Sequence, residues 1–158
     1  MEENNAENVE QLKSQHSIRP SFVRFVNCTP RTVDCIWINY EGRRIKYKTL
    51  HEKQYFDVCT FVSHPWIFRD SKTHDKMCVS SLENRQQKAQ RKDVFMPPDV
   101  IENGIFQKKR KIILITLPIY SLKERCFQFL RENLTCDISR LEIPLTIKQD
   151  YNVWLKGE

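Results

Sequence analysis

The side chains that could support nucleophilic or metal chemistry in this 158-residue chain are its six cysteines and four histidines. The cysteines form no CxxC pair, the spacing that zinc sites and redox motifs require. A nucleophile made from Cys59 or Cys78 with His64 would also need an orienting group and an oxyanion site, and the sequence indicates neither. We therefore predict a non-catalytic protein without metal or cofactor, in which the cysteines act as small hydrophobic residues.

Positive charge is the second feature that could define a function. The net charge is +6, and much of it lies in the basic runs 88–92 and 108–111. Such runs can bind nucleic acid or signal nuclear import, but more often they are solvated loops or strand edges. No aromatic residues interleave with them as a base-stacking platform would require. A nucleic-acid-associated domain is therefore kept only as the last of three functional alternatives.

The start of the chain is polar and lacks the apolar core of a secretory signal, so we expect none. Its composition is rich in Glu, Asn and Gln and predicts disorder over residues 1–17. Reduced cysteines and the absence of a signal favour the cytoplasm and the nucleus.

Short apolar segments separated by turn residues occupy residues 18–117 and predict a β-sandwich. Residues 21–27 alternate in polarity, residues 32–40 are β-branched and aromatic, and Glu41-Gly42 is a plausible hairpin turn. The most apolar segment, residues 111–117, is expected to be a central strand. Residues 81–93 are polar and glycine-free, which indicates an inserted loop.

Beyond Pro118 the pattern becomes helical. Ser121 followed by Glu124 is the capping-box arrangement, which satisfies two backbone donors at the start of a helix. Phe127 points away from the main apolar face, so the helix has two apolar faces and more apolar surface than the short remaining chain could cover. The residues of the main face are Leu122, Cys126, Phe129, Leu130 and Asn133. A second helical stretch is expected near Ser139, interrupted by Pro144 or with Pro144 in its first turn. We therefore predict a mainly β protein with a small α-domain at residues 118–158 that docks on another protein.

The segment TLPIYSLKERCFQFL resembles the elongin-C-binding segment, or BC-box, of the von Hippel–Lindau (VHL) family. The resemblance assigns the contacts with elongin C to Ser121, Leu122, Cys126 and Leu130. Farther along, the spacing of Ile143, Pro144, Ile147 and Tyr151 resembles the cullin-binding box that accompanies BC-boxes. The partners that this implies are elongin C with elongin B, a cullin and its RING protein.

Residues 19–79 resemble the β-domain of the same family. The matching positions include Asn27, Pro30-Arg31, Trp37, Asn39, Gly42, Tyr47, Thr49-Leu50, Trp66, Phe68–Asp70 and Thr73–Asp75. In that family the β-domain binds a trans-4-hydroxyproline of the hypoxia-inducible factor α-subunit. The hydroxyproline site that the resemblance implies consists of Trp37, Tyr47, Thr60, His64 and Trp66.

These residue types suit that ligand. Indole and phenol rings can enclose a flat pyrrolidine ring, and Thr60 with His64 can supply the donor and the acceptor that a buried hydroxyl needs. Without the resemblance, Trp37 and Trp66 would be interpreted as sandwich core. The chain departs from the family pattern at Thr60, where a serine is usual, and at Cys59, Phe61 and Pro65.

The function that these features predict is the substrate-recognition subunit of a cullin-RING (elongin BC) E3 ubiquitin ligase. It would bind prolyl-hydroxylated hypoxia-inducible factor α and target it for ubiquitination and proteasomal degradation. The departures near Thr60 motivate an alternative, an elongin-binding β-sandwich scaffold that serves unhydroxylated clients.

Overall fold

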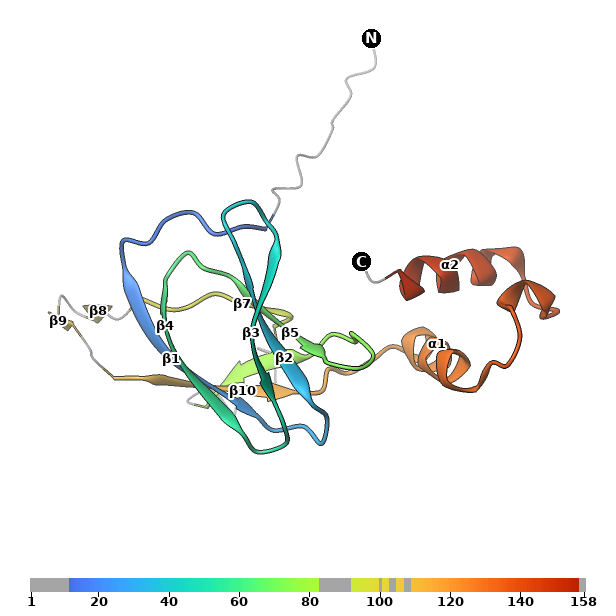
Figure 1. Ribbon diagram of the computed structural model, residues 1–158, viewed down its shortest axis with the longest axis horizontal. Coiled ribbons are helices and arrows are strands. Elements are labelled where there is room, and N and C mark those ends of the chain that lie inside the picture. Colours follow the sequence, from blue (N-terminus) through green and yellow to red (C-terminus); the bar gives the residue numbers. More distant parts are fainter. Residues whose placement is uncertain (1–11, 83–91, 100, 103–104, 107–108, 157–158) are drawn as a thin grey trace, which may run out of the picture. The chain divides into compact units, whose positions relative to one another are not determined.

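The computed structural model describes residues 12–82, 92–99, 101–102, 105–106 and 109–156. The chain divides into two compact units, with the division between Leu117 and Pro118. The first unit is built from strands and the second from helices, as Figure 1 shows. This confirms the prediction of a mainly β protein with a small α part.

The β unit is a sandwich of two four-stranded sheets (Figure 1). The first sheet has the order β4 (Tyr55–Phe61), β1 (Pro20–Asn27), β10 (Lys111–Thr116) and β6 (Cys78–Ser81). The second has the order β3 (Arg44–Leu50), β2 (Val33–Ile38), β5 (Trp66–Asp70) and β7 (Val94–Phe95). A separate hairpin joins β8 (Ile101–Glu102) to β9 (Ile105–Phe106).

The segment predicted to be a central strand is indeed internal. Strand β10 runs parallel to β1 on one side and antiparallel to β6 on the other. A strand with neighbours on both sides satisfies all its backbone groups, which suits the apolar sequence KIILIT. The prediction for this segment is therefore confirmed.

Strand β1 forms one side of the core, because every second residue from Ser21 to Asn27 is buried. Phe25 lies at its centre, fully buried. Its ring centroid is 5.4 Å from that of Trp66, 4.9 Å from Phe68 and 5.4 Å from Phe95. These rings join the two sheets, since Phe25 comes from the first and the other three from the second.

A β-bulge interrupts the pairing of β2 with β3. Cys35 is opposite Lys48 and Ile36 is opposite Lys46, so Tyr47 is the extra residue. A bulge bends its strand and redirects the inserted side chain, and bulges are common beside binding sites. Tyr47 is one of the predicted site residues.

The N-terminal segment corrects one prediction. Residues 12–17 fall within the region expected to be disordered, yet Ser14 is 2% exposed. Its Oγ donates to the Ile38 carbonyl at 2.6 Å and accepts from Trp37 Nε1 at 2.8 Å. The disorder prediction failed here because it considered only apolar burial, whereas this segment is held by polar groups at the end of the sheet. Residues 1–11 lie outside the described part.

Most of the predicted insertion at 81–93 also lies outside the described residues. At its start Ser81 still belongs to β6, and at its end Lys92 exchanges two backbone hydrogen bonds with Val79, at 2.9 and 3.1 Å. The two ends of the segment are therefore tied to the same strand.

The helical unit contains α1 (Leu122–Asn133), a 3-10 turn η2 (Ile138–Arg140) and α2 (Leu145–Leu155). The capping box is confirmed, because Ser121 Oγ accepts from the Glu124 amide at 3.1 Å and the Glu124 carboxylate accepts from the Ser121 amide at 2.7 Å. Pro144 separates η2 from α2 and serves as the N-cap of α2. It therefore interrupts the second helical stretch, one of the two arrangements expected.

A small core joins the two helices, which lie side by side in Figure 1. Phe127 of α1 lies 5.4 Å from Tyr151 and 5.7 Å from Trp154 of α2, between ring centroids. Ile138 completes the buried set. Among the described residues, no helix is long and apolar enough to cross a membrane.

Candidate functional site

The five residues predicted for a hydroxyproline site come together in the β unit. We call this set the aromatic site: Trp37 on β2, Tyr47 on β3, Thr60 on β4, His64 in the β4–β5 turn and Trp66 on β5. They come from both sheets and are separated by up to 29 positions in the sequence, so only the folded sandwich assembles them.

His64 is held by a tight turn and by ring contacts. Its amide donates to the Phe61 carbonyl at 3.0 Å, which closes the turn between β4 and β5. The imidazole stacks on Trp37 with 5.2 Å between centroids and 29° between planes, and Phe61 lies 5.1 Å away. The residue is 6% exposed, and this burial lowers the pKa of the imidazole, whereas a hydrogen bond with the His16 backbone acts in the opposite direction. The ring is therefore favoured in its neutral form, which has one donor and one acceptor nitrogen.

Trp66 and Thr60 form the floor of the site. The Trp66 indole is 2% exposed and donates from Nε1 to Thr60 Oγ at 3.1 Å. Since this bond uses a lone pair of the hydroxyl oxygen, the Thr60 proton is left for another acceptor. The methyl group that distinguishes threonine from the usual serine is accommodated with Thr60 at 3% exposure.

Tyr47 is the exposed member of the site. Its ring meets Trp66 at 5.1 Å and 69° and Trp37 at 6.0 Å and 87°, while 51% of the residue remains exposed. Edge-to-face contacts of this kind fix the ring without burying its hydroxyl. Tyr47 can thus contact both the protein wall and a bound ligand.

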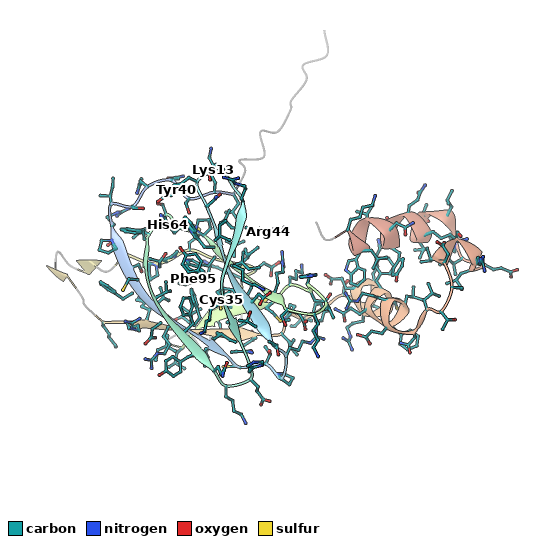
Figure 2. The ribbon with its side chains drawn as sticks, in the orientation of Figure 1. Lys13, Cys35, Tyr40, Arg44, His64 and Phe95 are labelled. Atoms are coloured by element: carbon teal, nitrogen blue, oxygen red, sulfur yellow. The ribbon has the colours of Figure 1, made fainter. Side chains whose placement is uncertain are left out.

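Sequence reasoning missed three residues that touch the site. Ser14 bonds to Trp37, and the hydroxyls of Ser17 and Tyr40 each lie 3.3 Å from His64 Nε2. Figure 2 shows Tyr40 and His64 near each other and near Lys13, close to the start of the described chain. Tyr40 is the last residue of a predicted strand and precedes a turn, which indicated its position but not its contact with His64. The serines gave no signal at all.

On the helical unit, the predicted elongin C contacts lie mostly on an open face. Ser121 and Cys126 are exposed and Leu122 is 82% exposed, whereas Leu130 is half-buried against the core of its own unit. A shallow depression is lined by Arg125, Cys126, Phe129 and Leu130. The second apolar face foreseen for this helix is formed by Phe127 and is covered by α2. The apolar surface left open is the one on which Leu122 lies.

The residues predicted to contact a cullin divide into two groups. Pro144 and Ile147 are exposed, and Ile143 is partly buried against the helical core. Tyr151 is 4% exposed and belongs to that core, and burial raises its pKa. Tyr151 therefore packs beside Phe127 in the free chain, and its assignment as a cullin contact stays a prediction.

Fold and sites together define a class of protein: a β-sandwich with an aromatic site, followed by a helical unit that leaves one apolar face open. Comparison with known proteins agrees. The family model "VHL beta domain" matches residues 12–92. Protein Vhl of Drosophila melanogaster is 33% identical over 135 residues, which cover 81% of this chain and 74% of the fly protein. The chain therefore belongs to the VHL family.

Proposed function

We propose that this chain is the substrate-recognition subunit of a cullin-RING (elongin BC) E3 ubiquitin ligase. It binds prolyl-hydroxylated hypoxia-inducible factor α at the aromatic site and targets it for ubiquitination and proteasomal degradation. The observation that carries the proposal is the pairing of Thr60 and His64 polar groups with the rings of Trp37, Tyr47 and Trp66. The ubiquitin chemistry belongs to the partner proteins.

The hydrogen-bonding capacity of the site fits a hydroxylated proline. A hydroxyl buried on binding needs one acceptor for its proton and one donor to its oxygen. Thr60 has an uncommitted proton because its oxygen accepts from Trp66, and a neutral His64 offers one acceptor nitrogen. A plain proline would leave both groups buried and unpaired, at a cost of about 1–3 kcal/mol each. The expected preference for the hydroxylated peptide is about 30- to 10⁴-fold.

The helical unit provides the second half of the proposal. Elongin C, which brings elongin B, docks on the open face of α1 at Ser121, Leu122, Cys126 and Leu130. The exposure of Leu122 and the depression beside Cys126 support this assignment. The cullin and its RING protein approach α2 near Ile143, Pro144 and Ile147, and the complex acts in the cytoplasm and the nucleus.

The test is peptide binding by the protein co-expressed with elongin C and elongin B. Three client peptides differ only at one position, which holds proline, trans-4-hydroxyproline or cis-4-hydroxyproline. We expect tight binding of the trans peptide alone. The cis peptide has the same composition, but its hydroxyl points to the opposite face of the proline ring. Equal affinities for all three would overturn the hydroxyproline assignment. Retained elongin capture with equal affinities would instead support the scaffold for unhydroxylated clients.

A further inference from the structure

The wall behind His64 is built from residues that the aromatic site does not include. Ser17 Oγ and Tyr40 Oη lie 2.5 Å apart, and each lies 3.3 Å from His64 Nε2. The three polar atoms thus form a closed triangle on one nitrogen of a buried imidazole. Ser17 belongs to the N-terminal segment 12–17 and Tyr40 follows β2, so the triangle joins two segments that are distant in sequence.

The Tyr40 ring is held in place independently of its hydroxyl. Its centroid lies 5.6 Å from Trp37 and 5.5 Å from His64, with interplanar angles of 86° and 87°. Both contacts are edge-to-face, a favourable geometry for aromatic rings. Because the ring is fixed by these neighbours, its hydroxyl approaches Nε2 in a defined direction.

A neutral imidazole can hold its proton on either nitrogen, and a hydroxyl pairs with either form, because it can donate to a bare nitrogen or accept from an N–H group. The two hydroxyls therefore hold the position of the ring and do not choose its tautomer. Because the triangle engages Nε2, the other ring nitrogen, Nδ1, is the one that the held ring can offer to a ligand hydroxyl.

We propose that Tyr40 is a positioning residue of the aromatic site, whose hydroxyl, together with that of Ser17, holds His64 Nε2 and so fixes the orientation in which the ring offers Nδ1 to a ligand hydroxyl. The identity of the ligand in this proposal rests on the proposed function. The contact between Tyr40 and His64 is present in the protein without ligand and does not depend on that function. Burial of the imidazole supports it, because a buried ring has little water to compete with the two hydroxyls.

The test uses Tyr40→Phe, which removes the hydroxyl and keeps the ring contacts. The matched control is Tyr55→Phe, because Tyr55 is an exposed tyrosine at the start of β4 whose ring lies under Arg24. Both variants are prepared in the full chain co-expressed with elongin C and elongin B. The readouts are the ¹⁵N chemical shifts of the His64 ring and the affinities for the trans-4-hydroxyproline and proline peptides.

We expect the same ¹⁵N shifts of the His64 ring in the parent protein and in Tyr55→Phe, and a displaced Nε2 shift in Tyr40→Phe, where one hydrogen bond to that nitrogen is lost. Affinity for the hydroxyproline peptide should fall about fivefold in Tyr40→Phe, the equivalent of one net hydrogen bond, with no change for the proline peptide. Ser17→Ala should act in the same direction, and the double variant should lose less than the two single losses combined.

Unchanged ¹⁵N shifts and unchanged hydroxyproline affinity in Tyr40→Phe would overturn the positioning role. Equal losses for both peptides would also overturn it, since that pattern indicates a general disturbance of the site. If the parent protein does not prefer hydroxyproline, the proposed function fails, and the ¹⁵N shifts still decide whether Tyr40 holds His64 Nε2.

Discussion

Trp66 and Thr60 are joined by a buried hydrogen bond, from the indole Nε1 to the threonine Oγ at 3.1 Å. This bond links the floor of the aromatic site to the sandwich core, because Trp66 also contacts Phe25 at 5.4 Å. The residue that would recognise a ligand hydroxyl is thus also the hydrogen-bond acceptor of a core tryptophan. Binding and stability are coupled at Thr60.

That coupling predicts two effects of Thr60→Val, which keeps the shape and removes the hydroxyl. The Trp66 N–H loses its acceptor in a buried place, so the free energy of unfolding should fall by about 1–3 kcal/mol. The preference for hydroxyproline over proline should fall as well. Urea unfolding and peptide titration measure the two effects. Thr60→Ser is the control, since it keeps the hydroxyl; a loss of preference in this variant would contradict the role given to the hydroxyl.

The lowered pKa of His64 predicts a pH dependence of stability. The unfolded chain, with a histidine pKa of about 6.5, takes up the proton before the folded protein does. The stability contribution of neutral His64 is therefore present above about pH 6.5 and is lost as the pH falls through the interval down to the folded pKa.

Urea unfolding at several pH values between 5 and 8 tests this expectation. The variant His64→Gln should show a weaker loss of stability on acidification than the parent protein. His51→Gln is the control, because His51 is exposed. Identical pH profiles for the parent protein and His64→Gln would contradict the assignment of the effect to His64.

Ser14→Ala tests the N-terminal segment. The substitution removes the donor to the Ile38 carbonyl and the acceptor for Trp37 Nε1, both at the end of β2. We expect a loss of about 1–3 kcal/mol in the free energy of unfolding and a changed Trp37 environment, seen in fluorescence. Gln15→Ala, at an exposed neighbouring position, should change neither. If Ser14→Ala behaved like Gln15→Ala, the segment would contribute nothing to the site.

The features that could be predicted from the sequence are those that depend on local pattern. Alternating polarity identified β1, and the pair Ser121 and Glu124 identified the start of α1, because both depend on neighbours a few positions away. The contacts of Ser14 and Tyr40 could not be predicted in this way, since they depend on how distant segments meet.

Tyr151 illustrates a different limit. Helical periodicity tells which residues share a face, but not whether that face is covered by the rest of the chain. In the structure Phe127 is its neighbour, so Tyr151 is part of the helical core, which periodicity alone did not indicate. For the aromatic site the family resemblance supplied what pattern could not, because Trp37 and Trp66 would otherwise have been interpreted as packing residues.

The open face of α1 gives the last prediction. Leu122→Ala and Cys126→Phe alter side chains that are exposed in the free protein, so unfolding should change by less than about 0.5 kcal/mol. Both should abolish capture of elongin C in a pull-down, the first by removing an anchor and the second by placing a bulky ring at the contact. Glu132→Ala, an exposed position near the other end of α1, should capture elongin C normally.

Phe127→Ala completes the comparison, because it removes the centre of the helical core. It should weaken elongin C capture only through loss of structure, with a clear drop in helical signal by circular dichroism. Leu122→Ala and Cys126→Phe should keep the helix and lose elongin C, whereas Phe127→Ala should lose the helix itself. This contrast separates an effect on docking from an effect on folding. Normal capture by both Leu122→Ala and Cys126→Phe would show that elongin C binds elsewhere, since neither substitution would then touch the interface.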